Sequence, residues 1–157
     1  MTPVSITAAD PKDLHRHWPL VRRGVGAVMR KLGKRRVDFI IPDVYAGLRN
    51  GSCTLHLVSR ETRVLGFLIS YPQLRPFSGK RELFCWIAWA LPLRERLPGD
   101  RDPAAALEAI QFLKEHGKKL ECDRIVVASS RRGLARYGFE PTITTWTLPI
   151  DATQNST

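Results

Sequence analysis

The spacing of apolar residues predicts an amphipathic helix near the N-terminus. Six of them, starting at Leu14, follow one another at intervals of three or four residues, which places them on one face of a helix. They are Leu14, Trp18, Val21, Val25, Val28 and Leu32. Pro19 lies inside this segment and cannot donate a backbone hydrogen bond, so we expect a kink there or a helix that begins near Pro19.

Shorter patterns lie on either side of this helix. Residues 4–9 alternate weakly between apolar and polar and are typical of a strand, and a short second helix is expected from Pro42 to Arg49. Alternation over 53–58 and 64–71, with a turn between them, predicts an antiparallel hairpin. The segment 72–80 contains two prolines and a glycine, which predicts a loop.

The second half of the chain reads as a strand, a loop and a helix, followed by shorter elements. The segment Leu83–Leu91 is apolar on both faces and should be a central strand covered on both sides. A helix is expected over Pro103–Leu120, with Asp102 as its N-cap. Three elements follow: a strand Arg124–Ala128, a short helix Ser130–Arg136 and a strand Thr142–Ile150.

This order of elements predicts an α/β (α+β) fold with a mixed central sheet and helices on both faces. The 157 residues are enough for one domain, which we place at 1–150, followed by a polar C-terminal tail at 151–157. The longest apolar run, Phe84–Leu93, is too short to span a membrane, and the N-terminus lacks a secretory pattern. We therefore expect a cytoplasmic protein without a membrane partner.

Cysteine and charge narrow the candidate chemistry. Cys53, Cys85 and Cys122 have no CxxC spacing and no histidine at a zinc-ligand distance, so we expect reduced core thiols and no metal site. The formal net charge of +10 favours an anionic partner, such as nucleic acid, an acidic protein surface or a phosphate-bearing cofactor.

The densest group of positive charges lies on the polar face and at the end of the first helix. Its members are Arg22, Arg23, Arg30, Lys31, Lys34, Arg35 and Arg36. One interpretation is a solvated helix face with favourable charges near its C-terminus. The other is a site for phosphate or for an acidic partner. Interleaved aromatic residues and known nucleic-acid-binding motifs are absent from this group.

Two segments resemble the GCN5-related N-acetyltransferase (GNAT) fold. The first is Asp43–Gly51 with the hairpin Cys53–Tyr71, which is similar to the second helix and to strands two and three of that fold. The second is Ser129–Pro141, which is similar to the closing helix of the family and its Gly-Phe-Glu-Pro ending. The resemblance implies acetyl-CoA as cofactor, held by backbone N–H groups where the helix after the central strand begins.

The segment that corresponds to the family's cofactor signature is altered. It spans Arg101–Ala106, so Arg101, Ala104, Ala105 and Ala106 are the cofactor-binding positions that the resemblance implies. Ala104 replaces the first glycine of the signature, Pro103 lacks an N–H group, and Asp102 adds a negative charge. If Asp102 caps the helix, it uses donors that the pyrophosphate needs. We therefore expect no cofactor, or acetyl-CoA if the protein is an active enzyme. In that case Arg101, and less directly Arg94 and Arg96, would compensate as phosphate ligands; the alternative is that they belong to a solvated charged loop.

The catalytic residues that the family implies are also altered. Many relatives carry a tyrosine as general acid four residues before the glycine of Gly-Phe, and this position is Leu134 here. Relatives also carry a glutamate as base in the central strand, whereas here Glu82 stands only at the start of that strand. No catalytic residue is assigned: Glu82 and Tyr137 are the remaining candidates, and Tyr137, at a position where relatives carry a core aliphatic residue, is also interpreted as a packing residue.

A closer resemblance links the chain to small GNAT-like proteins of tailed bacteriophages. It rests on tryptophans in the central strand, on Arg136–Pro141 and on the Thr-Trp-Thr-Leu closing strand. It implies a virion or assembly protein with a degenerate acetyl-CoA site, found in the host cytoplasm or the virion, whose partners are other proteins of a phage assembly. The alternatives are an active acetyl-CoA-dependent N-acetyltransferase and a basic accessory protein that binds nucleic acid.

Overall fold

The computed structural model describes residues 2–31, 33, 40–75, 77–127 and 132–141. Within them, five strands form one mixed sheet in the order β1-β2-β3-β4-β5, with antiparallel neighbours except for the parallel pair β4 and β5. The strands are β1 (Val4–Ala8), β2 (Thr54–Arg60), β3 (Arg63–Leu74), β4 (Arg81–Ala90) and β5 (Arg124–Val127). This confirms the predicted mixed sheet; the expected last strand over 142–150 and the tail lie outside the described residues.

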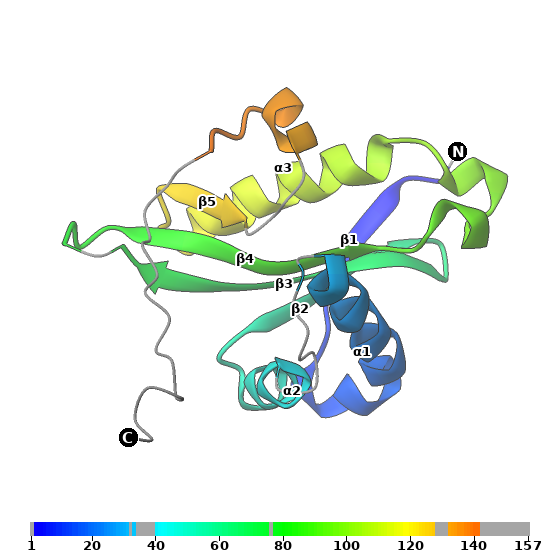
Figure 1. Ribbon diagram of the computed structural model, residues 1–157, viewed down its shortest axis with the longest axis horizontal. Coiled ribbons are helices and arrows are strands. Elements are labelled where there is room, and N and C mark those ends of the chain that lie inside the picture. Colours follow the sequence, from blue (N-terminus) through cyan, green and yellow to red (C-terminus); the bar gives the residue numbers. More distant parts are fainter. Residues whose placement is uncertain (1, 32, 34–39, 76, 128–131, 142–157) are drawn as a thin grey trace, which may run out of the picture.

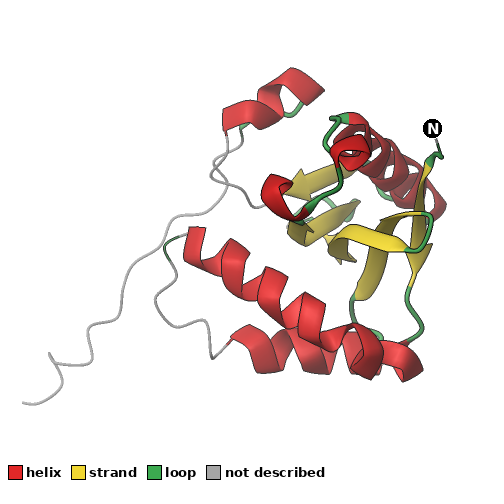
Figure 2. Cartoon of the chain, turned by 90° about the vertical axis from the view of Figure 1, so that its right-hand side faces the viewer, coloured by secondary structure: helices red, strands yellow, loops and turns green. Residues whose placement is uncertain are grey.

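Helices cover both faces of the sheet, as Figures 1 and 2 show. On one face lie α1 (Leu14–Lys31) and α2 (Ile40–Asn50), and on the other lies α3 (Ala104–Lys119). The connections contain the short 3-10 helices η1 (Pro11–Asp13), η3 (Leu93–Glu95), η4 (Pro98–Asp100) and η5 (Arg132–Tyr137). No helix in the described part of the chain is long and apolar enough to cross a membrane.

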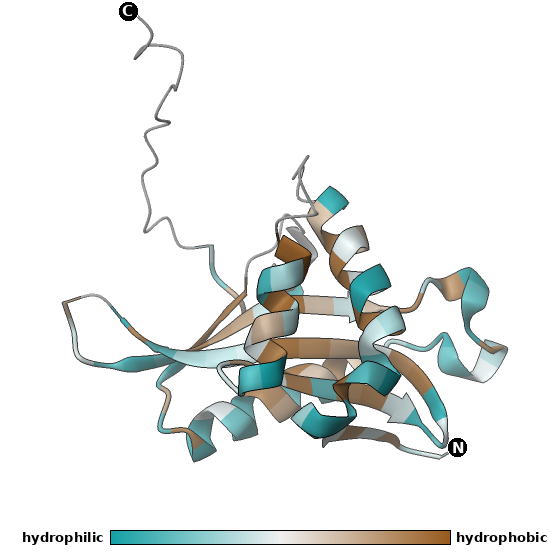
Figure 3. Cartoon of the chain, turned by 90° about the horizontal axis from the view of Figure 1, so that it is seen from below, coloured by the Kyte–Doolittle hydropathy of each residue, from teal (hydrophilic) through white to brown (hydrophobic). Residues whose placement is uncertain are grey.

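Each face of the sheet has its own hydrophobic core. On the α1 and α2 face, Val21, Val25 and Val44 pack against Phe67 and Ile69 of the sheet. Figure 3 views this face and shows hydrophobic strand segments running beneath the two helices. On the α3 face, the smaller core contains Val58, Leu68, Leu83, Cys85 and Leu113. Cys53 and Cys85 are buried and Cys122 is half-buried, all three as free thiols.

Two predictions about prolines need correction. α1 begins at Leu14 and continues through Pro19, so the alternative start near Pro19 is wrong. β3 extends to Leu74 and includes Pro72, which is paired with Leu83 of β4, so the loop predicted from residue 72 begins later. β2 pairs with β3 only as far as Ser70, so one edge of β3 is open at Pro72 and tolerates a residue without an N–H group.

A bulge in β4 changes which side chains face each helix layer. Ile69 pairs with Ile87 and Ser70 with Cys85, so Trp86 is an extra residue in β4. Before the bulge, Leu83 and Cys85 face α3, whereas after it Ile87 and Trp89 belong to the core under α1. The bulge therefore turns the large side chains at the end of β4 away from α3.

Gly24 allows α1 to lie close to the sheet. A Cβ atom at Gly24 would lie 2.4 Å from Cε1 of Phe67 and 2.8 Å from Cδ2 of Trp89. At Gly26, in the same helix, a Cβ would meet only the flexible guanidinium of Arg30, at 3.4 Å. The two glycines therefore have different roles, although the sequence pattern treats them alike.

His56 of β2 is buried under α3, and its Nδ1 atom has no hydrogen-bond partner among the described residues. Its ring lies 4.7 Å from that of Phe112 and 4.8 Å from that of His116, between ring centroids. Burial, with a smaller contribution in the same direction from the nearby His116, lowers the pKa of His56 to about 4. The packing of α3 on the sheet therefore requires a neutral His56.

We expect Gly24→Ala to lower the free energy of unfolding by about 1–3 kcal/mol, because the new methyl group overpacks the contact with Phe67 and Trp89. Gly26→Ala is the matched control and should raise stability by up to about 1 kcal/mol through helix propensity. Urea denaturation followed by circular dichroism measures both values. Equal effects of the two substitutions would contradict the close contact at Gly24.

His56 should make stability fall as the pH is lowered. Its pKa is about 4 in the folded protein and 6.5 for the free side chain, so between these values the unfolded state binds a proton that the folded state does not. With respect to His56, the free energy of unfolding is therefore highest above pH 6.5 and decreases as the pH falls towards 4. We expect His56→Leu to flatten this dependence in urea denaturation, whereas His15→Gln, at an exposed position of α1, should leave it unchanged. Parallel pH profiles for the wild type and His56→Leu would exclude this role.

Candidate functional site

The C-terminal half of β4 has an open edge in the described part of the chain. β4 pairs with β5 from Glu82 to Cys85, and the register ends at the pair Cys85 and Val127. On the opposite edge, Leu91 N donates to Leu65 O at 2.8 Å. Because bonded pairs alternate in an antiparallel ladder, the peptide groups of Ala88 and Ala90 point away from β3, towards the open edge.

The side chains at this edge leave space. Ala88 and Ala90 are small and exposed. Trp86 and Trp89 are the large residues that would fill a gap between β4 and β5, but both pack against the core on the α1 and α2 face. The open edge therefore offers backbone donors and acceptors to an extended ligand, in the way that an edge strand accepts another strand.

The start of α3 is a second feature of the site, and here the sequence prediction was wrong. Asp102 does not cap α3: the cap position is Pro103, and no side chain makes a capping hydrogen bond. Ala106 N donates to Pro103 O at 3.1 Å, whereas the N–H groups of Ala104 and Ala105 have no acceptor among the described residues. These groups and the helix dipole therefore remain available to an anion.

Asp102 is drawn away from the helix by an arginine of β2. Its Oδ1 atom lies 3.5 Å from a terminal nitrogen of Arg60. Arg60 is 4% exposed and also donates to Asp100 Oδ1 at 3.1 Å and to Gly99 O at 2.5 Å. Arg63 donates to both oxygens of Asp100, at 3.0 and 3.3 Å. We call Arg60, Arg63, Asp100 and Asp102 the loop clamp.

The loop clamp holds the segment between β4 and α3 against the end of the β2–β3 hairpin. Hydrogen bonds from Arg63, with a smaller contribution from Arg60, hold the pKa of Asp100 below its usual range, although burial acts in the opposite direction. Asp100 is therefore ionised at neutral pH. Arg60 and Arg63 balance the charges of Asp100 and Asp102, so these aspartates contribute little negative field to the start of α3.

Three arginines of the same segment form no ion pair with a carboxylate among the described residues, although the charge of Arg94 acts on Glu95. Arg94 and Arg101 are exposed, and Arg96 donates to the backbone carbonyls of Leu91 and Asp100, at 2.6 and 3.5 Å. Glu95, the remaining acid, is paired with Arg23 of α1. The segment that leads into α3 therefore has excess positive charge, which favours an anionic ligand.

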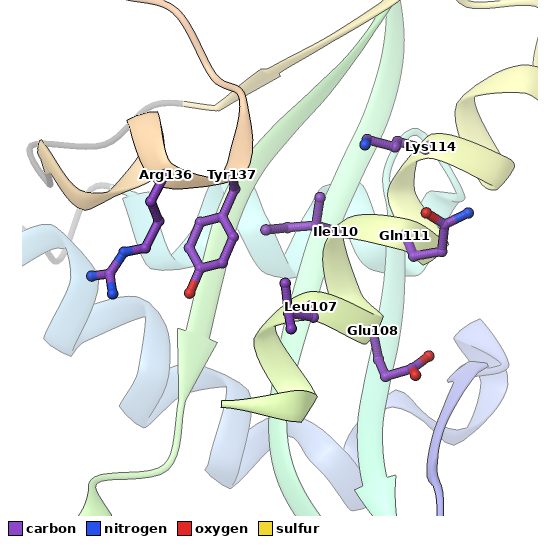
Figure 4. Close-up of a pocket in the computed structure, with 7 residues that line it drawn as sticks. All are labelled: Leu107, Glu108, Ile110, Gln111, Lys114, Arg136 and Tyr137. Atoms are coloured by element: carbon purple, nitrogen blue, oxygen red, sulfur yellow. The ribbon is translucent and has the colours of Figure 1, made fainter. Parts of the chain in front are cut away.

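Tyr137 lies beside α3 in a pocket of about 390 Å³ between α3 and η5. Figure 4 shows its ring facing Leu107 and Ile110 of α3. The guanidinium carbon of Arg136 lies 5.5 Å from the centre of the ring. The pocket combines an apolar floor with the polar groups of Glu108, Gln111, Lys114 and Arg136. Tyr137 is therefore a half-buried pocket residue, and its catalytic role stays a prediction.

Glu82 lies at the opposite end of β4 from Ala88, six residues or roughly 20 Å along the strand. It accepts hydrogen bonds from Arg124 at 2.6 Å and from Gln73 at 2.7 Å. Burial acts to raise its pKa, but these hydrogen bonds outweigh burial and hold the pKa below the usual range. We therefore do not include Glu82 in the site at the end of β4.

The predicted basic group is only partly described. Arg22, Arg30 and Lys31 are exposed on α1, whereas Lys34, Arg35 and Arg36 lie outside the described residues. Arg23 differs from the others because its guanidinium lies 5.6 Å from the centre of the Trp89 ring and donates to Glu95. Its contacts connect α1 to η3 instead of leaving it free for a partner.

Sequence reasoning missed the loop clamp and the open edge of β4. Arg60 ends a strand that reads as apolar, and Asp100 sits in a loop with many charges, so neither residue stands out. The available signal was weak: an arginine buried at the end of a strand needs a carboxylate, and the loop after the central strand contains three.

Comparison with known proteins identifies the fold. No protein-family model and no curated protein matches the chain. Among solved structures, a GCN5-related N-acetyltransferase from Ralstonia eutropha matches with a TM-score of 0.69 and 15% identity over 94% of this chain and 99% of that one.

Two further structures contain a cofactor. A predicted acetyltransferase from Clostridium acetobutylicum, solved with acetyl-CoA, matches with a TM-score of 0.66 and 15% identity over 99% of this chain and 100% of that one. An aminoglycoside N-acetyltransferase in complex with CoA matches with a TM-score of 0.65 and 14% identity over 96% of both chains. At these identities the comparisons establish the GNAT fold.

We expect Asp100→Asn to lower the melting temperature by at least several degrees at pH 7, because it removes the nearer and more buried of the two carboxylates that compensate Arg60. The difference from wild type should narrow as the pH falls through the depressed pKa of Asp100, since protonation then removes the same charge. Glu61→Gln is the control, because it removes only the exposed partner of Arg63. Thermal unfolding followed by circular dichroism would contradict the loop clamp if both variants melted like the wild type.

Proposed function

We propose that this protein is an acetyl-CoA-dependent N-acetyltransferase. The observation that carries the proposal is the free N-terminus of α3, where the N–H groups of Ala104 and Ala105 have no acceptor among the described residues. One argument from sequence against cofactor binding was that Asp102 uses these donors; the others were Pro103, which lacks an N–H group, and Ala104 in place of a glycine. Since Asp102 pairs with Arg60 instead, the first argument no longer applies.

The residues at the site suit the two ends of the cofactor's reactive arm. The N–H groups of Ala104 and Ala105 suit the pyrophosphate, with Arg101 as a side-chain ligand. The missing glycine of the signature is no obstacle at Ala104 as long as the backbone N–H groups themselves remain accessible. The peptide groups of Ala88 and Ala90 suit the amide-containing arm, which can bind along the open edge of β4.

Acetyl-CoA supplies an acetyl group activated as a thioester. The contribution of the protein is to hold the reacting groups close together and to polarise the carbonyl by backbone N–H groups. No general base is assigned at the end of β4, because Glu82 lies at the other end of the strand and Tyr137 lies in the pocket beside α3. We therefore propose catalysis that rests mainly on positioning.

The other candidate functions have less support. The phage assembly role with a degenerate cofactor site rested on the altered loop residues 102–104 and on Leu134 at the tyrosine position, and the capping part of that argument no longer applies. The phage origin rests on sequence resemblance alone. In the basic group of the nucleic-acid-binding alternative, Arg23 contacts Trp89 and Glu95, and Lys34, Arg35 and Arg36 lie outside the described residues. Neither function is favoured by a specific contact in the described residues.

Binding of CoA tests the proposal directly. We expect isothermal titration to detect binding of CoA, and Ala105→Asp to weaken it at least about tenfold, because a carboxylate at the start of α3 occupies the free donors and repels the pyrophosphate. Arg101→Gln should weaken it less. Lys118→Gln is the control, because it changes the charge equally but lies about 20 Å away at the other end of α3.

Three results would contradict the proposal. They are no heat of CoA binding at high concentration, an equal effect of Ala105→Asp and Lys118→Gln, and no acetylated product by mass spectrometry from a panel of primary amines with acetyl-CoA. Circular dichroism of each variant checks that the fold is kept.

A further inference from the structure

We propose that Glu95 and Trp89 form a subsite for a positively charged group of the acceptor, and that Arg23 fills this subsite when no acceptor is bound. The inference rests on the proposed function, and it names the acceptor class as an amine that carries a second positive charge. It explains why one arginine of the basic face of α1 turns towards the sheet.

The contacts of Arg23 are those of a bound cation. Its guanidinium carbon lies 5.6 Å from the centre of the Trp89 ring, on which a cation is attracted by the electrons of the ring face. The same guanidinium donates a hydrogen bond to the carboxylate of Glu95. That bond holds the pKa of Glu95 below its usual range, so the carboxylate is ionised at neutral pH. An alkylammonium group can make both contacts equally well.

The subsite lies next to the open edge of β4. Trp89 stands between Ala88 and Ala90 in the chain, and the peptide groups of these alanines point to the open edge. The Trp89 ring packs on the α1 face, and Glu95 follows β4 in η3. When the charged end of a ligand takes the place of Arg23, the rest of that ligand therefore lies next to the open edge at the end of β4.

The Arg23 contact is built so that it can be exchanged. The side chains of Arg23 and Glu95 are 45% and 34% exposed, so solvent screens the pair and a competing cation can enter without unfolding the core. Arg23 reaches the subsite from the exposed face of α1, so its guanidinium can move into solvent when another cation replaces it. A buried pair such as Arg60 with Asp100 has no such freedom.

The acceptor needs two basic groups for a chemical reason. A nitrogen held by a carboxylate is kept protonated and has no lone pair for attack on a carbonyl. The reacting nitrogen must therefore be a different one, placed at the β4 edge while the first group stays bound. The formal net charge of +10 opposes cationic ligands at long range, but this field is screened beyond about 8–10 Å, so contacts at the subsite decide the specificity.

Spermidine is a suitable probe because it carries several amino groups on a flexible chain. We expect isothermal titration without acetyl-CoA to show that Arg23→Gln binds spermidine about tenfold more tightly than wild type, because the competing guanidinium is gone. The double variant Arg23→Gln with Glu95→Gln should lose this gain. Arg16→Gln is the matched control, because it removes one charge from α1 and releases the exposed carboxylate of Asp13, while Arg16 makes no cation–π contact among the described residues.

The titrations with spermidine test whether the subsite exists. A gain in Arg16→Gln equal to that in Arg23→Gln, or a gain that survives Glu95→Gln, would overturn it. Acetylation is measured separately: Arg23→Gln should lower the KM for spermidine but leave that for butylamine unchanged. If spermidine binding follows the expected order and no amine is acetylated, the subsite is supported and the proposed function fails.

Discussion

The burial of one arginine constrains the candidate site. Arg60 ends β2 under the loop that joins β4 to α3, where its charge has to be compensated. Asp100 supplies the carboxylate and Gly99 a carbonyl, so the loop must cross the end of the β2–β3 hairpin before it enters α3. This path brings Asp102 to the same guanidinium and away from the helix. The free N-terminus of α3 is therefore a consequence of satisfying Arg60.

The bulge at Trp86 has a comparable effect on the neighbouring strand. Without an extra residue, Ile87 and Trp89 would lie on the same side of the sheet as Leu83 and Cys85, which is the side of α3. With it, Ile87 and Trp89 enter the core beneath α1, and Ala88 is left exposed on the α3 side. Gly24 completes the arrangement, because α1 can approach Trp89 only without a side chain there. Packing on one face thus leaves space on the other.

The sequence predicted the elements well because their signals are local. The apolar stripe of α1, the hairpin and the two-sided apolar strand β4 depend on residues within a few positions of one another. The corrected features are not local. Whether Pro72 belongs to β3 depends on where β2 ends, and whether Asp102 caps α3 depends on Arg60, more than forty residues earlier. A capping pattern gives only the local preference, and a buried charge outweighs it.

Arginine side chains have three different roles in this molecule, and the surroundings of each arginine determine its role. Arg60 is buried and sets the path of a loop, and Arg101 is exposed beside a helix N-terminus where an anion can bind. Arg23 lies on a tryptophan and meets a carboxylate, which is an environment for a cation. The net charge indicates an anionic partner, whereas the contact of Arg23 indicates a cationic one. The two indications agree if the cofactor is the anion and the acceptor is the cation. The cofactor then binds at the N-terminus of α3 and along the edge of β4, and the acceptor binds at Trp89 and Glu95.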